Sequence, residues 1–589
     1  MPQPLPLNVA RRLGKRTSQI PLSRISSCNP PSKFAVIQLV PSRKASSNAT
    51  DVQSINSHTT GKRALATVRN SAAHLETDPH RERVVILGSG WGGYTFSREV
   101  SPKLYSPIVI SPRTYFVFTP LLTDAAGGSI DFSNITEPIR DRSCKADYIQ
   151  AAARWIDFKN KTVVCESTVI KKDVTETPRA VLEERTDEDR GGEYGALSPT
   201  AYKQQWERGD MFEIPYDKLV ISVGAVARTF NTPGIKDNAM FFKDIGDARR
   251  VKRRVRECFE LAALPTSTPE MRKWLLHFAI VGGGPTGTEL AGSLRDFIFG
   301  DIIKLYPSLA GLPKITVYDV APKVLSMFDE SLSKYAMDHM RKEGIAVKTS
   351  HHIQSLRWGA PNTTGPHPMD PKGPLTITTK EEGEVGVGVC VWATGNAMRK
   401  LVRDSLQSVD TFPLNSALMK DGQRPPDSVT KSGWHVKKSP RGGALQVDSH
   451  LRVQLENDKG DVAVLQDVFA IGDNAVPEGA PVPATAQATR QEAKWLAARF
   501  NQRDFATIPG FTFQNMGMLA YLGAQRGLMQ LPQEEGQRSK VLPANLKGRT
   551  AWMVWNSAYI GMSISWRNKL RLIFRWTLNR LFGRDVSRF

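Results

Sequence analysis

The chain lacks paired cysteines. Its 589 residues include only five, and these lie far apart: Cys28, Cys144, Cys165, Cys258 and Cys390. No CxxC or CxxxxC pair occurs, so the sequence encodes neither a zinc knuckle nor a redox dithiol, and we predict no metal site. Disorder is excluded for most of the chain, because 40% hydrophobic residues can build ordinary packed cores. At about 150 residues per domain, we expect roughly three or four domains.

Acidic residues are absent from the first fifty positions. Residues 1–80 hold eleven Lys or Arg against only Asp51, Glu76 and Asp78, which gives this segment +8 of the chain's net charge of +21. The segment is rich in Ser and has no uninterrupted apolar core, which excludes a typical secretory signal. This composition indicates a mitochondrial transit peptide, and a disordered basic tail is the alternative.

Long hydrophobic runs are also absent. No run near the N-terminus reaches the length of about 20 apolar residues that a membrane-spanning helix needs. Residues 551–566 carry no charge, but these sixteen residues include Asn556 and three serines. The segment is therefore too short and too polar to predict a membrane span.

A glycine-rich turn follows the first apolar strand pattern. Residues 83–87, RVVIL, lead into GSGWGG, and a helical pattern and a second apolar run, PIVIS, come next. The GxGxxG motif is satisfied by Gly88, Gly90 and Gly93. In the order strand, turn, helix, strand, this motif predicts a pyrophosphate bound at the helix N-terminus. The acid expected about 20 residues further on is missing, because the second run ends in Ser111, Pro112 and Arg113.

The same pattern recurs 194 residues later. The run HFAIV leads into GGGPTG, where the motif glycines are Gly282, Gly284 and Gly287. The strand pattern KITVYD then ends in Asp319, an acid placed to bind a ribose 2′-hydroxyl and to repel a 2′-phosphate. The second unit therefore predicts a preference for NADH over NADPH, with a solvated strand end as the alternative for Asp319.

Three further strand patterns end at glycine. DKLVISVGA, with Gly224, and VCVWATG, with Gly395, indicate strands that run into tight turns beside a ligand. DVFAIGDNA places Asp473 directly after a strand and a glycine, where its carboxylate can accept hydrogen bonds from sugar-alcohol hydroxyls. Alone, the Gly-Asp pair could be a simple turn. Together, the units predict an α/β fold with two Rossmann-like dinucleotide-binding domains.

These segments resemble a known family. The stretches VVILGSGWGGYTF, ISPRTYFVFTPLL, IVGGGPTGTELAG, VYDVAPKVLSMFDESLSKYA, VFAIGDNA and PATAQATRQEAKWLA are similar, in order and spacing, to the type II (alternative, rotenone-insensitive) NADH:ubiquinone oxidoreductases of mitochondria. Polar stretches at roughly 171–210, 355–388 and 401–445 interrupt the resemblance and look like surface insertions. The resemblance implies a flavoprotein that binds FAD, oxidises NADH and reduces ubiquinone without pumping protons.

The resemblance also implies roles for particular residues. The first GxGxxG motif matches the FAD pyrophosphate turn, and Asp473 matches the acid at the ribityl chain. The adenosine end is matched by Ser111 and Arg113, and the loop beside the isoalloxazine ring by Thr119 and Pro120. The second GxGxxG motif and Asp319 match the NADH site. Glu289 matches a carboxylate near the nicotinamide and the flavin.

A third motif, AQATRQE, matches the family's quinone end of the flavin through Ala486, Gln487 and Gln491. We predict Glu289, Gln487 and Gln491 as the catalytic residues. Relatives often show AHQE where this chain has TRQE, with Thr489 and Arg490. Arg stays charged at any ordinary pH, which puts a proton-delivery role at Arg490 in doubt.

The C-terminal residues repeat apolar side chains at helical spacing. One stripe contains Trp566, Leu570, Ile573, Phe574 and Leu581, and the opposite face contains Asn568, Arg571, Arg575 and Asn579. Tryptophans and a basic face suit a helix that lies in the headgroup plane of an anionic membrane. The alternative is an ordinary amphipathic helix packed on its own domain or on a second subunit. If the tail binds the membrane surface, deleting residues 551–589 should release the protein from membranes and spare NADH oxidation.

We predict five parts of the chain: a transit peptide or disordered segment (1–80), the first part of the FAD domain (81–235), the NADH domain with insertions (236–430), the second part of the FAD domain with the quinone segment (431–510) and a membrane-anchoring domain (511–589). We expect peripheral binding to the mitochondrial inner membrane by a homodimer. The missing stop-transfer segment favours the matrix side.

A basic flavoprotein similar to apoptosis-inducing factor, acting through interactions that include nucleic acid, is the alternative function. It would need a basic patch over the folded body, but residues 81–550 carry a net charge of only +7, whereas residues 551–589 carry +6. We therefore expect no nucleic-acid partner. His277, His351 and His352 show no partner pattern and are predicted to be structural or surface residues.

Overall fold

The structure is a computed structural model that describes residues 80–141, 145–169, 209–409, 411–479, 482–505, 507–532, 543–584 and 586. All of these residues belong to one structural unit, residues 62–589. The predicted transit peptide and most of the predicted insertion at 171–210 lie outside the described residues.

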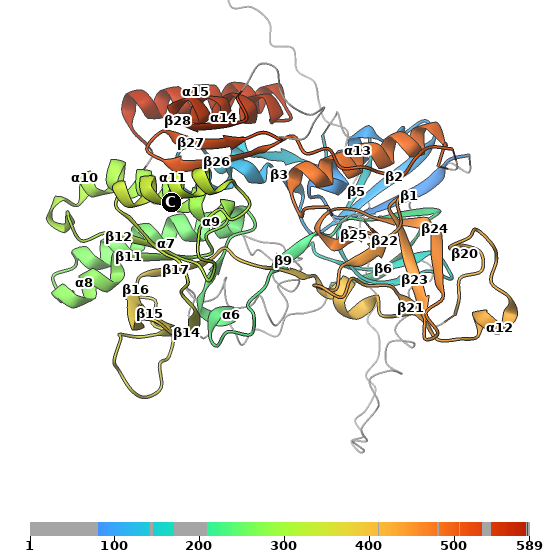
Figure 1. Ribbon diagram of the computed structural model, residues 1–589, viewed down its shortest axis with the longest axis horizontal. Helices are drawn as coiled ribbons and strands as arrows, with labels where there is room; N and C mark the ends of the chain where they lie inside the picture. Colours follow the sequence, from blue (N-terminus) through green and yellow to red (C-terminus); the bar gives the residue numbers. More distant parts are fainter. Residues whose placement is uncertain are drawn as a thin grey trace, which may run out of the picture. The chain divides into compact units, whose positions relative to one another are not determined.

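The first nucleotide motif follows a strand at the centre of a large mixed sheet (Figure 1). Its parallel centre consists of, in sheet order, β24 (Val462–Ala470), β8 (Lys218–Ile221), β1 (Glu82–Leu87), β2 (Tyr105–Ser111) and β5 (Asp147–Asp157). β1 and β8 are almost continuously buried, as expected of parallel strands covered on both faces. β24 comes from a distant part of the chain, so two separate segments build this sheet.

Antiparallel strands extend this sheet on both sides. Beyond β5 lie β6 (Thr162–Ser167) and β7 (Met211–Pro215). Beyond β24 lie β23 (Arg452–Asn457), β21 (Trp434–Val436) and β19 (Ser408–Val409), with β20 (Ala417–Met419) paired to β24. Shorter strands complete the region: β3 (Tyr115–Val117), β4 (Thr136–Pro138), β9 (Ala225–Ala227), β18 (Asn396–Met398), β22 (Leu445–Val447) and β25 (Ala475–Pro477).

The second nucleotide motif belongs to a separate parallel sheet. Its order is β10 (Met240–Phe241), β17 (Val389–Trp392), β11 (His277–Val281), β12 (Lys314–Tyr318) and β13 (Ile345–Lys348). β11 lies at the centre and is buried along its whole length. The two sheets match the predicted pair of Rossmann-like units, and the chain leaves the first sheet, builds the second and returns.

The segments predicted as surface insertions contain regular structure. Residues 355–388 largely form an antiparallel sheet of β14 (Ile353–Trp358), β15 (Leu375–Thr379) and β16 (Gly383–Val387). Residues 401–445 supply β19, β20 and β21 to the first sheet. Their polar composition conceals these strands, because a strand with one covered face needs apolar residues only at alternate positions.

Helices flank both sheets. The helices that shape the site are α2 (Trp91–Glu99), α3 (Leu122–Ala126), α7 (Ile245–Ala263), α9 (Pro285–Phe297) and α13 (Ala486–Gln502). The others in this part are α6 (Ile235–Asn238), α8 (Pro269–Leu275), α10 (Ile303–Leu305), α11 (Glu330–Lys342) and α12 (Asp427–Thr430). α7 begins at Asp244, whose side chain accepts a hydrogen bond from the Asp247 amide in a capping box.

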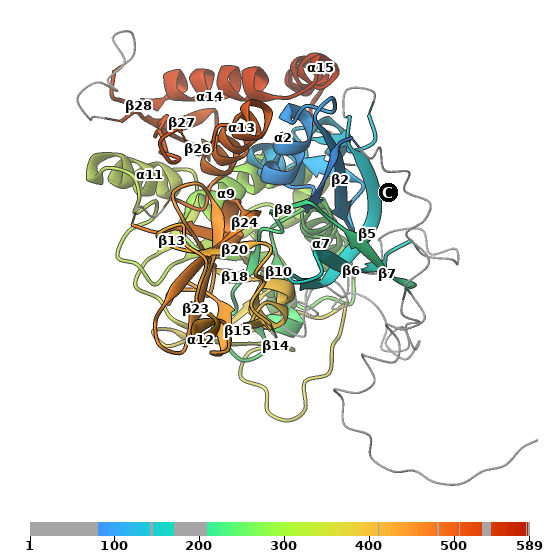
Figure 2. The same ribbon diagram turned by 90° about the vertical axis from the view of Figure 1, so that its right-hand side faces the viewer.

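The C-terminal residues form a small antiparallel sheet and two helices, drawn in red at the top of Figures 1 and 2. The strands are β26 (Met518–Gly523), β27 (Arg526–Gln530) and β28 (Asn545–Gly548), and the helices are α14 (Arg549–Met562) and α15 (Trp566–Phe582). α14 packs on β27 and buries a face that contains Ala551, Trp555 and Tyr559. Among the described helices, none combines the length and apolar character needed to cross a bilayer.

Candidate functional site

The first GxGxxG turn has the geometry that its glycines predict. Gly88 has φ +106°, and a Cβ there would lie 2.2 Å from the Ser222 carbonyl oxygen. A Cβ on Gly93 would lie 1.9 Å from the Gly88 carbonyl oxygen, so this glycine allows α2 to pack on the turn. A Cβ on Gly90 would meet nothing within 4 Å. The N-terminus of α2 therefore opens onto free space, as a pyrophosphate site requires.

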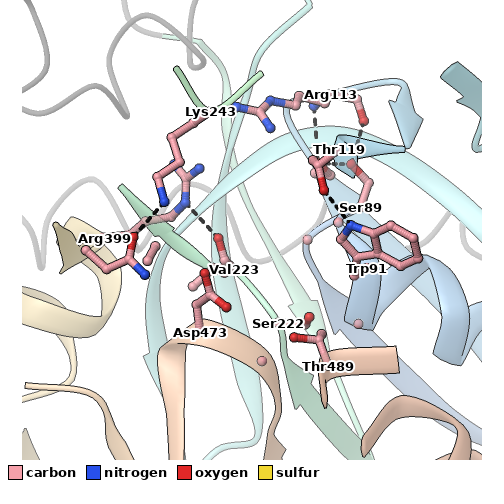
Figure 3. Close-up of a pocket in the computed structure, with 18 of the residues that line it drawn as sticks. Ser89, Trp91, Arg113, Thr119, Ser222, Val223, Lys243, Arg399, Asp473 and Thr489 are labelled. Atoms are coloured by element: carbon pink, nitrogen blue, oxygen red, sulfur yellow. Dashed lines mark hydrogen bonds between the residues drawn. The ribbon is translucent and has the colours of Figure 1, made fainter. Parts of the chain in front are cut away.

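This free space is a cavity of about 990 Å³ between the two nucleotide units (Figure 3). Its volume lies at the upper end of the roughly 300–1,000 Å³ typical of small-molecule and cofactor sites. The cavity brings together these predicted residues: Gly88, Gly90, Ser111, Arg113, Thr119, Gly224, Glu289, Gly395, Asp473 and Ala486. The cavity thus holds the first GxGxxG turn together with residues of the second unit, such as Glu289 and Gly395.

Other predicted residues do not line this cavity. They are Gly93, Pro120, Gly282, Gly284, Gly287, Asp319, Gln487 and Gln491. The second GxGxxG turn nevertheless repeats the geometry of the first: a Cβ on Gly287 would lie 1.9 Å from the Gly282 carbonyl oxygen, and one on Gly284 would meet nothing within 4 Å. Asp319 accepts hydrogen bonds from the backbone amides of Gly283 and Ala321. Those amides fix its carboxylate at the end of β12, beside the turn.

The side of the cavity formed by the first GxGxxG turn is held by short polar contacts. The Trp91 indole donates to the Thr119 hydroxyl over 2.9 Å, and the hydroxyls of Ser89 and Ser111 lie 2.9 Å apart. Arg113 forms an ion pair with Asp244, with 2.6 Å between nitrogen and oxygen. Because Asp244 caps α7, this pair ties the predicted adenosine end of the first unit to the start of the second.

Asp473 faces a lysine that sequence reasoning missed. Lys243 lines the cavity, donates to the Asn396 side-chain oxygen over 2.6 Å, and lies near Asp473 and Arg399 (Figure 3). Desolvation by the cavity walls lowers the pKa of Lys243, and burial raises the pKa of Asp473 while the lysine opposes this shift. Nothing in the local sequence FFKD distinguishes Lys243 from a surface lysine, because Asn396 and Asp473 are distant in the chain.

Glu289 lies at the cavity wall near the start of α9 and is 8% exposed. Burial raises its pKa to about 8, and a hydrogen bond of 3.2 Å from the Tyr521 amide only partly opposes the shift. The buried indole nitrogen of Trp555 also faces this carboxyl group and lowers its pKa. Glu289 is therefore mostly protonated at pH 7, and the C-terminal domain covers it.

The two predicted glutamines contact backbone. Gln491 donates to the Gln514 carbonyl oxygen over 2.8 Å and accepts from the Gln514 amide over 3.0 Å. Gln487 accepts from the Met516 amide over 3.4 Å. The two glutamine side chains thus fix the segment that enters the C-terminal domain. Within the AQATRQE motif, Ala486 and Thr489 line the cavity. The catalytic role of the glutamines stays a prediction.

The histidines have partners that the sequence did not reveal. His277 is buried in β11, where its ring nitrogens contact the Thr316 hydroxyl and the Gly386 carbonyl oxygen, and burial lowers its pKa to about 4. His352 contacts Glu381 over 2.9 Å at the surface. None of these side chains lines the cavity.

Two family descriptions match the chain. Residues 82–493 match the pyridine nucleotide-disulphide oxidoreductases, and residues 515–585 match the NDH2 C-terminal domain. The second match covers the C-terminal domain that contacts Glu289. The cavity lining includes no cysteine, and the three cysteines of the described residues are buried free thiols.

Curated relatives cover most of the chain. An external alternative NADH-ubiquinone oxidoreductase, mitochondrial, of Yarrowia lipolytica is 30% identical over 546 residues, which cover 88% of this chain and 83% of that protein. A probable NADH dehydrogenase of Dictyostelium discoideum is 31% identical over 514 residues, which cover 86% of this chain and 91% of that protein. The structure of NDH2 from Plasmodium falciparum in complex with NADH has a TM-score of 0.65 at 22% identity, with 86% of this chain and 100% of that chain covered, which supports the fold.

Proposed function

We propose, because this chain belongs to the pyridine nucleotide-disulphide oxidoreductase family and within it to the alternative NADH-ubiquinone oxidoreductases, that it oxidises NADH with FAD and reduces ubiquinone at the mitochondrial inner membrane. The observation that carries the proposal is a cavity lined by both nucleotide units, with Glu289 in its wall. The resemblance to type II enzymes further implies electron transfer without proton pumping.

The residues of the cavity fit FAD, and the second GxGxxG turn with Asp319 beside it fits NADH. When bound, FAD supplies the hydride and electron-transfer chemistry. The protein therefore has to bind and orient the cofactor and the nucleotide, and to exclude water. The open N-terminus of α2 suits the FAD pyrophosphate, and Asp473 suits hydroxyls of the ribityl chain. Glu289 holds a proton at neutral pH at the wall between the two units, where it can donate a hydrogen bond or a proton.

Steady-state kinetics test the activity. The purified protein should oxidise NADH with a short-chain ubiquinone and should be reduced by NADH without oxygen, which bleaches the visible flavin band. Absence of bleaching by NADH in a protein that contains FAD would refute the proposal. Vesicles that contain the active enzyme should build no membrane potential during turnover.

We also propose that α15 binds the surface of an anionic membrane. The predicted apolar stripe points outward: Trp566 is 76% exposed, Leu570 63% and Phe574 65%. Three residues of the opposite polar face contact the body instead. Asn568 donates to Glu137, Asn579 to the Ser129 carbonyl oxygen, and Arg575 pairs with Asp131.

This orientation is the reverse of an ordinary amphipathic surface helix, whose apolar stripe faces the core. It argues against the alternative in which the stripe packs on its own domain. The exposed Arg571, on the polar face next to the stripe, suits anionic lipid headgroups. An apolar stripe with a basic residue near its border suits a lipid surface better than nucleic acid.

The homodimer and the matrix-side location stay predictions. Sedimentation of the detergent-solubilised protein tests the dimer.

The Yarrowia relative carries the word external in its name, whereas the sequence of this chain favours the matrix side. In intact mitochondria, a matrix enzyme will not oxidise added NADH until the inner membrane is permeabilised, and immediate oxidation would overturn the matrix assignment.

A further inference from the structure

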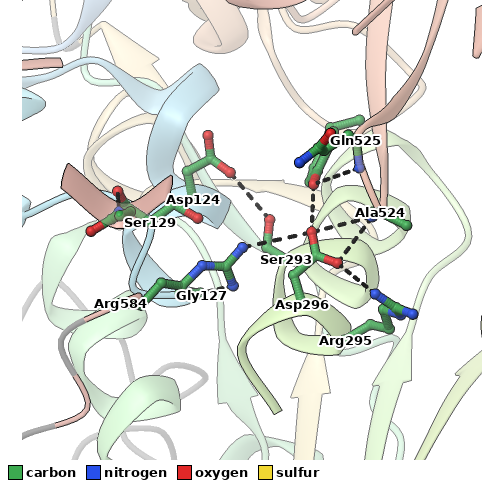
Figure 4. Close-up of polar contacts among 12 residues, drawn as sticks. Asp124, Gly127, Ser129, Ser293, Arg295, Asp296, Ala524, Gln525 and Arg584 are labelled. Atoms are coloured by element: carbon green, nitrogen blue, oxygen red, sulfur yellow. Dashed lines mark hydrogen bonds and ion pairs between the residues drawn. The ribbon is translucent and has the colours of Figure 1, made fainter. Parts of the chain in front are cut away.

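A line of buried polar groups runs along one face of α9, away from the cavity. Glu289, Ser293 and Asp296 are four and three residues apart, so they share this face. Asp124 of α3 lies opposite, and the Ser293 hydroxyl donates to its carboxylate over 3.4 Å (Figure 4). Packing is tight here, since a Cβ on Gly127 would lie 2.8 Å from the Ser293 carbonyl oxygen.

Strand β26 holds both ends of this face. The Tyr521 amide donates to Glu289 over 3.2 Å, and the Tyr521 hydroxyl donates to Asp296. The Ala524 amide donates to Asp296 over 2.9 Å. The carboxyl groups at the two ends of the face are therefore bonded to one strand of the C-terminal domain.

Arg584 reaches the same cluster from the end of α15. Its guanidinium nitrogens lie 3.7 Å from an Asp296 oxygen and 3.6 Å from an Asp301 oxygen, and one donates to the Gly127 carbonyl oxygen over 3.2 Å (Figure 4). The Arg584 side chain is only 17% exposed. It links the helix that carries the exposed apolar stripe to α9, to the π-helical segment that continues α9 (Ile298–Ile302) and to the end of α3.

The cluster needs this charge, because a buried carboxylate is costly without a partner. Burial raises the pKa of Asp124 to about 7, and Arg584 is the leading influence that lowers it. Arg295 also contacts Asp296, but it is shared with Glu343. Further titratable or charged groups that face the cluster from neighbouring elements are Tyr521, Tyr559 and Asp301. Nearby, His339 contacts the Gly523 carbonyl oxygen and Lys252 lies over the Phe297 ring.

We propose that Arg584 is a positioning residue for Glu289: it fastens the end of α15 to the face of α9 that carries this acid and balances the buried carboxylates beside it. The proposal rests on the proposed function, in which Glu289 acts in the cavity. It gives the membrane-facing helix a direct mechanical and electrostatic connection to the cavity wall.

Charge removal at Arg584 tests the electrostatic part. The variant Arg584→Gln should move the transition that belongs to Asp124 in the pH profile of NADH oxidation upward by roughly half to one unit, because Arg584 lowers the pKa of this carboxyl and loss of the positive charge favours its neutral form. The direction holds whichever protonation state is active. Arg584→Lys keeps the charge and should restore the wild-type profile. Arg580→Gln removes an exposed charge from the same helix and should leave the pH profile of NADH oxidation unchanged.

Hydrogen–deuterium exchange of the purified holoenzyme tests the mechanical part without relying on activity. Arg584→Gln should increase exchange in peptides from α9 and β26, whereas Arg580→Gln should not. If Arg584→Gln does not fold, Asp301→Asn replaces it: this variant keeps the arginine but removes one of its partners, so exchange in α9 should rise while the pH profile stays near wild type.

Two outcomes would overturn the proposal. One is a pH profile and an exchange pattern of Arg584→Gln that match those of Arg580→Gln, and the other is unchanged exchange in Asp301→Asn when the first variant does not fold. A wild-type protein that fails to oxidise NADH refutes the proposed function instead, and the exchange measurement still decides whether Arg584 fastens α15 to α9.

Discussion

Glu289 shows what burial does to a single side chain. The carboxyl group contacts a backbone amide and faces an indole, and burial raises its pKa from 4.5 to about 8. An acid with a raised pKa binds more protons in the folded than in the unfolded state. The free energy of unfolding therefore falls as the pH rises from about 4.5 to 8. A residue placed for catalysis thus weakens the fold at neutral pH.

We expect Glu289→Gln to stabilise the protein at pH 7 and slow NADH oxidation. The neutral amide avoids the ionisation cost, which by linkage is at most about 3 kcal/mol at pH 7. Thermal unfolding should show a higher midpoint for the variant at pH 7 and equal midpoints at pH 4, where the wild-type carboxyl is protonated in both states. A variant less stable than wild type at pH 7 would contradict the assigned cause.

Asp319 carries the expected discrimination between nucleotides. Backbone amides of Gly283 and Ala321 fix its carboxylate, so a 2′-phosphate would meet a fixed negative charge. Asp319→Asn should reduce the ratio of kcat/KM for NADH over NADPH by roughly tenfold, equivalent to about 1.4 kcal/mol. Steady-state kinetics with both nucleotides measure this ratio. If it does not change, Asp319 does not face the ribose.

At the scale of an element, α15 presents its polar face to the protein and its apolar stripe to the outside. Ser565 caps its start by accepting from the Asn568 amide, and Asn568 itself is buried against Glu137. The helix is therefore held by hydrogen bonds and ion pairs together with the buried Leu572, whereas the side chains of the predicted apolar stripe do not pack on the protein. These side chains remain available for a lipid surface.

The double variant Leu570→Ser and Phe574→Ser should weaken binding to anionic vesicles roughly a hundredfold, because two large apolar side chains contribute about 3 kcal/mol in total. Cosedimentation with vesicles measures this, and NADH oxidation with a water-soluble acceptor should be retained. Leu305→Ser, which changes a leucine 57% exposed on α10, is the matched control and should bind normally. Equal vesicle binding by all three proteins would indicate another anchor.

At the scale of the whole molecule, the C-terminal domain is part of the site as well as the proposed anchor. Trp555 of α14 is 2% exposed and faces Glu289, and β26 bonds both Glu289 and Asp296. The sequence suggests that residues 551–589 can be deleted without loss of NADH oxidation. The structure argues against this, because the deletion removes the cover of the cavity acid.

We therefore expect deletion of residues 551–589 to lower NADH oxidation with a water-soluble acceptor at least tenfold, in addition to releasing the protein from membranes. Exposing Glu289 to water removes the burial that raises its pKa. The double variant on α15 separates the two effects, since it should lose only membrane binding. A truncated protein with wild-type activity would show that α14 is dispensable for catalysis.

The sequence by itself determined the two nucleotide units and their order. Each GxGxxG turn is a local steric requirement, and Gly88, Gly93, Gly282 and Gly287 meet it with backbone contacts that no side chain could allow. The apolar stripe of α15 was also visible, because helical spacing is local. The short strands at 401–445 could not be recognised from the sequence, since each buries only a few residues among polar ones.

Only the tertiary structure decided which face of α15 points outward and which distant groups surround Glu289. Asn568, Trp555, Tyr521 and Arg584 take their roles from partners more than two hundred residues away along the chain. Local pattern records a side chain's chemistry and periodicity, but burial and pairing depend on which segments the fold brings together. The protonation of Glu289 and its connection to α15 therefore belong to the folded molecule.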